Sequence, residues 1–189
     1  MRFRLGAIGL QTSALLLMTS VAMSASPPHS TEAPPEEAER ESLRGVSGVE
    51  VHVEPLDSEI EQLGMTAGKL VQTIRQRLQK TGVKVLTERE RLANPATAVL
   101  SVRLDTLHDR IGRYFYSADL FLSQRAKLET PGAPEVSAVT WKKLGVVSTV
   151  ADDNVKHLED QVLRKVDQFI KDYLAVNPDR KVTDQRSRQ

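Results

Sequence analysis

The feature that most constrains the fold is the C-terminal segment from Asp152 to Asn177, where apolar residues recur at intervals of three and four. This spacing places them on one face of a long helix, with charged residues on the opposite face. Asp152 and Asp153 suit a helix N-terminus, and Asn177 before Pro178 predicts its end. A helix of this kind must cover another layer of the protein. The predicted buried positions are Val155, Leu158, Val162, Val166, Phe169, Ile170 and Tyr173.

The residues before this helix contain the alternation of apolar and polar side chains that is typical of strands with one buried face. Between the first two strands, the pattern over Thr66–Thr81 predicts a helix that ends at Gly82. In the last strand we place Val139 and Trp141 on one face and expect Gly145 to mark a bulge. The predicted strands are 49–53, 83–86, 99–107, 113–128 and 136–147.

These elements follow one another in the order β-α-β-β-β-β-α. The order predicts an α+β domain over residues 45–177, with a single mixed sheet of about five strands and two helices packed on one face. The first strand, the helix and the second strand form a βαβ unit in this interpretation. A short helical turn is expected at residues 88–93, where Thr87 and Glu90 have the spacing of a capping box.

The N-terminus has the pattern of a secretory signal peptide over residues 1–25. Arg2 and Arg4 precede an apolar run from Leu5 to about Met18, and small residues follow this run. The run is short for a spanning helix, so we expect cleavage and no stable membrane insertion; the alternative is an uncut membrane anchor. The chain has no cysteine for lipid attachment. We therefore expect a periplasmic or secreted product.

Two polar segments flank the predicted domain. Residues 26–44 contain four prolines and five glutamates but few large apolar side chains, so they cannot bury enough surface to offset the cost of ordering. We expect a disordered linker there and a disordered polar tail over residues 178–189.

The runs GVEVHVEPLD and GVKVLTERERL, separated by an amphipathic helix and followed by a meander and a terminal helix, carry a resemblance to known families. This layout resembles small bacterial envelope accessory domains: the N-terminal domain of TolB, the curli-secretion lipoproteins and the lipoproteins that activate penicillin-binding proteins. The resemblance implies a mixed sheet with helices on one side and a domain that binds other envelope proteins without catalysis. Unlike the lipoprotein members, this chain lacks a cysteine for a lipid anchor.

The sequence offers little support for catalysis. It lacks the G-x-S-x-G, S-x-x-K, H-E-x-x-H, P-loop and G-x-G-x-x-G patterns of common hydrolases and nucleotide enzymes. His108 with Asp105 and Asp109 resembles a metal or acid–base cluster, but a polar turn explains these residues more simply. Asp152 and Asp153 are better explained as helix caps than as catalytic carboxylates. We expect no enzyme activity, no metal and no cofactor.

The sequence also leads us to expect no nucleic-acid partner. The basic residues of the first long helix and of the segment after it are interrupted by Glu88 and Glu90, and no aromatic residues lie among them. A solvated helix face explains this charge pattern. The basic residues considered are Arg75, Arg77, Lys80, Lys84, Arg89 and Arg91.

The strand alternation places Arg103, Asp119, Phe121 and Arg125 on the sheet face away from the helices. Aromatic and arginine side chains are enriched at interface anchors, so these four are the candidate binding residues. The expected function is an exported, non-catalytic envelope accessory domain that engages another protein through its sheet face or edge. The alternative is a carrier of a small amphiphilic ligand, held in a cavity lined by Tyr114, Tyr116, Trp141 and Phe169.

Overall fold

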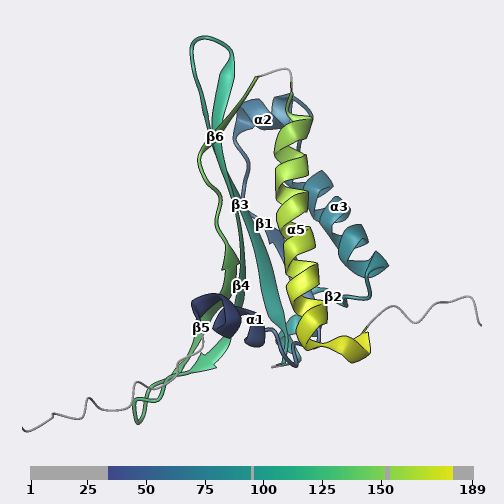
Figure 1. Ribbon diagram of the computed structural model, residues 1–189, viewed down its shortest axis with the longest axis vertical. Coiled ribbons are helices and arrows are strands. Elements are labelled where there is room, and N and C mark those ends of the chain that lie inside the picture. Colours follow the sequence, from purple (N-terminus) through teal and green to yellow (C-terminus); the bar gives the residue numbers. More distant parts are fainter. Residues whose placement is uncertain (1–33, 95, 152–153, 181–189) are drawn as a thin grey trace, which may run out of the picture. The chain divides into compact units, whose positions relative to one another are not determined.

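The computed structural model describes residues 34–94, 96–151 and 154–180, and they form an α+β domain (Figure 1). A six-stranded mixed sheet carries helices on one face, which confirms the predicted fold class. The strands are β1 (Val49–Val53), β2 (Val85–Leu86), β3 (Ala98–His108), β4 (Arg113–Lys127), β5 (Glu135–Lys143) and β6 (Ser148–Ala151). The helices are α1 (Pro35–Glu41), α2 (Ser58–Gln62), α3 (Ala67–Lys80), α4 (Glu88–Leu92) and α5 (Lys156–Val176), followed by the 3₁₀ helix η1 (Pro178–Arg180).

The sheet has the strand order β2-β1-β3-β4-β5. β1 is parallel to both β2 and β3, and β3, β4 and β5 form an antiparallel meander. The predicted βαβ unit is therefore present as β1, α3 and β2. β6 pairs with the first residues of β4, whereas β5 pairs with its second half. β5 and β6 thus lie one after the other along the same edge of β4.

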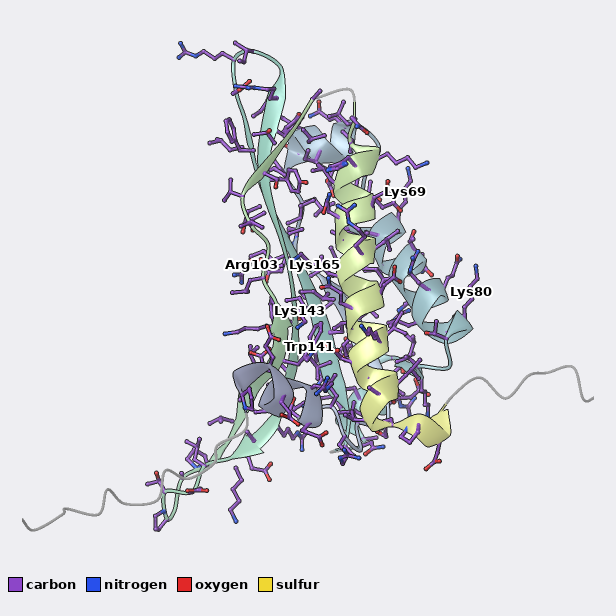
Figure 2. All side chains as sticks on the ribbon, in the orientation of Figure 1. Lys69, Lys80, Arg103, Trp141, Lys143 and Lys165 are labelled. Atoms are coloured by element: carbon purple, nitrogen blue, oxygen red, sulfur yellow. The ribbon has the colours of Figure 1, made fainter. Side chains whose placement is uncertain are left out.

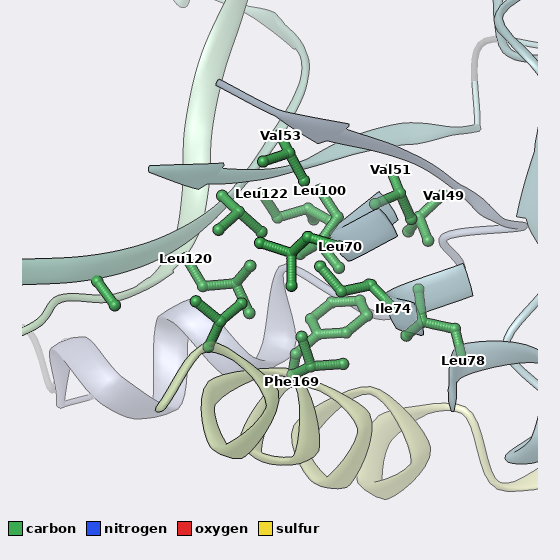
Figure 3. Packing of buried hydrophobic residues seen from close by; sticks show 14 of the residues in the cluster. Val49, Val51, Val53, Leu70, Ile74, Leu78, Leu100, Leu120, Leu122 and Phe169 are labelled. Atoms are coloured by element: carbon green, nitrogen blue, oxygen red, sulfur yellow. The ribbon is translucent and has the colours of Figure 1, made fainter. Parts of the chain in front are cut away.

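α3 and α5 lie side by side on one face of the sheet and bury their apolar stripes against it (Figures 1 and 3). Six of the seven positions predicted from the spacing in the last helix are buried, and Val155 is the partly buried exception. On the solvent side, Arg77 joins the two helices by donating two hydrogen bonds to Asp167, at 2.6 and 2.7 Å. Burial of each large apolar side chain stabilises the fold by about 1.5–3 kcal/mol, so this interface contributes a large part of the hydrophobic stabilisation.

The ends of α5 agree in part with the prediction. The helix begins at Lys156, and the predicted caps Asp152 and Asp153 lie outside the described residues. It ends at Val176, and Asn177 is the C-cap residue, as expected. The Asn177 side chain is almost fully buried and links the helix end to the start of the domain, because its Nδ2 donates to the carbonyl of Leu43 at 2.9 Å.

The predicted disordered linker is wrong for residues 35–44. Residues 35–41 form α1, and Leu43 just after it is completely buried in the core. Ser42 also contributes, since its Oγ donates a hydrogen bond of 2.9 Å to the carbonyl of Thr140 in β5. A single apolar anchor and a few hydrogen bonds are enough to order this segment, and composition alone did not reveal them. Residues 1–33, which include the predicted signal peptide, lie outside the described residues.

The predicted strand over residues 136–147 is also corrected, because the chain forms β5, a break, and then β6. Leu122 pairs with Trp141 and Ser123 with Val139, so Thr140 is an extra residue in β5. This bulge reverses the direction of the side chains before it. Consequently Trp141 is buried, with 1% of its surface exposed, whereas Val139 is 54% exposed and does not share its face. Of the predicted disordered tail, residues 178–180 form η1, and residues 181–189 lie outside the described part.

Candidate functional site

The sheet face opposite α3 and α5 is the part of the molecule where the predicted binding residues lie, and we call it the open face. Along β4 the helix-facing side chains from Tyr114 to Leu122 are buried, while Phe115, Asp119 and Phe121 alternate with them and are only half-buried. In β3, Arg103 stands directly opposite Asp119. Figure 2 shows Arg103 extending from the sheet on the side away from α5.

Arg103 is held in place by two neighbours on the open face. It donates two hydrogen bonds to the carboxylate of Glu54, at 2.8 and 3.0 Å, and its guanidinium lies over the ring of Phe121, 5.6 Å from the ring centre. The hydrogen bonds from Arg103 hold the pKa of Glu54 below its ordinary value. The flat guanidinium therefore forms a fixed polar rim beside an aromatic surface, an arrangement that is common in protein interfaces.

Asp119 has a structural role at the break between β5 and β6. Its Oδ1 accepts a hydrogen bond of 2.6 Å from the backbone N–H of Gly145. The residue before Gly145 is also held, because the ammonium of Lys165 in α5 donates a hydrogen bond of 2.8 Å to the carbonyl of Leu144. Partial burial of this ammonium lowers the pKa of Lys165. Gly145 lies so close to β4 that a Cβ atom would be 2.6 Å from the carbonyl oxygen of Ala118. The break is thus fixed against the sheet.

A groove of about 420 Å³ opens beside Phe121, between the open face and α1, and we call it the open-face groove. Its apolar surface includes Val139 and Leu144, which are 54% and 62% exposed. Arg103 and Lys142 lie at its rim and bring positive charge to an otherwise apolar surface. The lining residues are Glu39, Arg103, Phe121, Val139, Thr140, Trp141, Lys142 and Leu144.

The structure brings only some of the predicted binding residues together. Arg103 and Phe121 line the open-face groove, and Asp119 supports its edge through Gly145. Arg125 lies apart from them, in a second groove of about 370 Å³ that Arg91 also lines.

Of the eight lining residues of the open-face groove, the sequence analysis assigned only Arg103 and Phe121 to a binding surface. Val139, Lys142 and Leu144 are among those that it missed. The bulge at Thr140 reverses the assignment of faces, and no residue pattern marks that bulge. The sequence did contain one sign that the regular strand ends near here: in the stretch Leu144–Val147, apolar residues stop alternating with polar ones.

The residues considered for metal binding or acid–base chemistry belong to a turn and its neighbours. Asp109 accepts hydrogen bonds from the backbone of Ile111 and from Arg113. Loss of hydration acts to raise its pKa, but these hydrogen bonds outweigh that effect and lower it. His108 stacks on Tyr114, and its Nδ1 lies 3.4 Å from the carboxylate of Glu59. Among the described residues, no three His, Cys, Asp or Glu side chains are arranged to hold a metal ion.

The aromatic side chains proposed to line an amphiphile cavity fill the interior instead. Tyr114, Tyr116, Trp141 and Phe169 are at most 5% exposed. Trp141 and Phe169 make an edge-to-face contact with ring centres 5.2 Å apart, and the indole N–H donates to Asp172. This packing gives no support to a ligand between the sheet and α5.

No helix within the described residues has the length and apolar character needed to cross a membrane. Comparison of the chain with protein-family models and with curated proteins finds no match.

Proposed function

We propose that this chain is an exported, non-catalytic accessory domain of the bacterial envelope that binds another protein through its open face. The open-face groove is the observation that carries this proposal. It combines exposed apolar side chains, Val139 and Leu144, with an aromatic ring, Phe121, and with a guanidinium that is already held in place, Arg103. Arginine and aromatic side chains are enriched at protein interfaces, and an exposed apolar surface with a polar rim is typical of a site for protein binding.

Two further features support binding in preference to catalysis. Two charged side chains near the groove are used in structural contacts, since Arg103 pairs with Glu54 and Asp119 holds Gly145. A protein partner gains from such a rim because the guanidinium is already ordered and little rotamer entropy is lost on binding. Export is part of the proposal and is supported by the N-terminal sequence pattern alone.

The proposal is tested by affinity capture from envelope extracts with a groove variant, Val139→Lys combined with Leu144→Lys. Both side chains are more than half exposed, so the fold should tolerate the change while the apolar groove gains two charges. The matched control, Leu92→Lys combined with Ile111→Lys, alters two exposed apolar residues elsewhere. We expect one partner to be captured by the wild type and the control and to be lost with the groove variant. Equal capture by all three proteins would contradict the proposal.

A further inference from the structure

The groove that contains Arg125 opens at the C-terminal end of β4, and we call it the second groove. Its volume of about 370 Å³ is enough for a small molecule, since ligand pockets usually measure about 300–1,000 Å³. The end of α4, the start of β3, the end of β4 and the start of β5 form its walls. It shares no lining residue with the open-face groove, so any ligand here occupies a separate site.

Several polar side chains of the second groove already fix its walls. Thr97 is only 7% exposed, and its hydroxyl lies 2.6 Å from the carbonyl of Asn94 and 3.0 Å from that of Arg91. This contact joins the loop after α4 to the start of β3. The Asn94 side chain accepts a hydrogen bond of 2.9 Å from the backbone of Ala96, and the Nε of Arg91 donates to the carboxylate of Glu50 in β1. The shape of the groove is therefore set before a ligand arrives.

The remaining polar side chains at this end of β4 and β5 have their donors unused. The terminal nitrogens of Arg91 and the whole guanidinium of Arg125 have no acceptor among the described residues. The hydroxyls of Ser123 and Ser137 also lack a hydrogen bond within the described part of the chain. Ser137 stands directly opposite Arg125 in the pairing of β4 with β5. Two guanidinium groups and two hydroxyls thus line one hollow with hydrogen-bonding capacity to spare.

The charge of Arg125 is not offset in the way that the charges of the other strand arginines are. Arg103 in β3 and Arg113 in β4 each donate to a carboxylate, whereas Arg125, the third arginine of the strands, has no such partner among the described residues. The lining contains one acid, Glu135, which stands directly opposite Lys127 in the β4–β5 pairing. A cross-strand pair of this kind offsets the charge of Glu135. The second groove therefore keeps a positive charge at Arg125.

Unused guanidinium and hydroxyl donors around a positive charge fit one class of ligand group. The planar fork of an arginine binds carboxylate and phosphate oxygens through pairs of charge-assisted hydrogen bonds. A neutral apolar ligand would leave these donors without partners, and a cation would be repelled. We propose that the second groove binds an oxyanion, the carboxylate or phosphate group of a small ligand, with Arg125 as the main contact and Arg91 as the second.

Nuclear magnetic resonance of the full chain, purified as the cell processes it, tests this site with two probes. Sodium phosphate and sodium succinate are each titrated to about 20 mM, and sodium chloride at equal ionic strength gives the effect of charge screening alone. Because the probes have few atoms, we expect weak but saturable binding, with a Kd of about 0.1–5 mM. The signals to shift are the Nε–Hε group of Arg125 and the backbone amides of Ser123 and Ser137. The probe with the lower Kd identifies the oxyanion as phosphate or carboxylate.

Two substitutions of Arg125 separate specific binding from general attraction of anions. Arg125→Gln should weaken binding by about tenfold or more, since it removes the charge and the fork. Arg125→Lys should weaken it by about threefold or more, since it keeps the charge and loses the fork. Arg125 is exposed and makes no described bond, so both variants should fold normally, which their spectra also check. The matched control is Arg110→Gln, an exposed arginine at the far end of β4, and it should bind as the wild type does.

Three results would overturn the proposal: shifts that do not saturate or that sodium chloride reproduces, an Arg125→Gln variant that binds as the wild type does, or an Arg110→Gln control that is weakened equally. The titration contains no second protein. Its result therefore does not depend on partner capture, and this proposal and the proposed function can fail separately.

Discussion

Replacing Gly145 with alanine should destabilise the protein, because the added methyl group has no space. A Cβ atom at this position would lie 2.6 Å from the carbonyl oxygen and 2.8 Å from the nitrogen of Ala118. Both atoms belong to the backbone of β4, which is paired with β3 on one side and with β5 and β6 on the other. The clash can therefore be relieved only by moving Gly145 away from the sheet.

Such a movement breaks the hydrogen bond from the N–H of Gly145 to Asp119 and strains the contact of Leu144 with Lys165. Overpacking typically costs about 1–3 kcal/mol, and a hydrogen bond to a charged group contributes about 1.5–3 kcal/mol, less where water competes. Because the same movement causes both losses, the two costs overlap. We expect the free energy of unfolding to fall by about 2–3 kcal/mol.

Urea unfolding measures this change, with Trp141, the single tryptophan of the chain, as the fluorescent probe and far-ultraviolet circular dichroism as an independent one. Gly68→Ala is the matched control, since a Cβ atom at Gly68 in α3 would meet nothing within 4 Å. That substitution should stabilise the protein by about 0.4–1 kcal/mol through the loss of backbone freedom in the unfolded chain. A Gly145→Ala variant within about 0.5 kcal/mol of the wild type would refute the steric argument.

Three further predictions concern the core, the open face and α1. Phe169→Ala should lower the free energy of unfolding by about 3–5 kcal/mol in urea titrations, because it leaves a cavity beside Trp141; a loss below about 1 kcal/mol would show that α5 does not pack as described. Arg103→Gln should raise the pKa of Glu54 towards 4.5 in a carboxyl NMR titration. The stabilisation from this pair is present above pH 4.5 and is lost as the pH falls through the lower folded-state pKa, so an unchanged Glu54 titration would contradict the pairing. Leu43→Ala should cost about 2–5 kcal/mol and expose α1 to limited proteolysis, whereas a truly disordered linker would show neither effect.

The sequence predicted the central layers of the fold because their periodicity is strong. The alternation along β4 and the spacing of three and four along α5 each extend over many residues, so single exceptions do not obscure them. In the structure the apolar faces of both elements are buried, as the patterns predict; Val166 and Phe169 of α5, for example, are completely buried.

The prediction failed where one residue decides the structure. The bulge at Thr140 changes the face on which Val139 lies, and a regular alternation cannot reveal an extra residue in one strand. Similarly, α1 is ordered by its contacts with β5 and α5, and the polar composition of residues 26–44 obscures the single anchor Leu43. For the candidate site, the alternation along β3 and β4 placed Arg103 and Phe121 on the open face correctly. Which residues of β5 join them in the groove is set by the bulge at Thr140, which the alternation does not reveal.

The central claim, that the open face binds another protein, is tested most directly by a photo-crosslinking amino acid placed at Val139 in the open-face groove. The same probe at Gln76, on the exposed side of α3, serves as the comparison. After irradiation in cells, we expect the probe at position 139 to give one discrete adduct with a second protein and the probe at position 76 to give none. No adduct at 139, or the same set of adducts at both positions, would contradict the account.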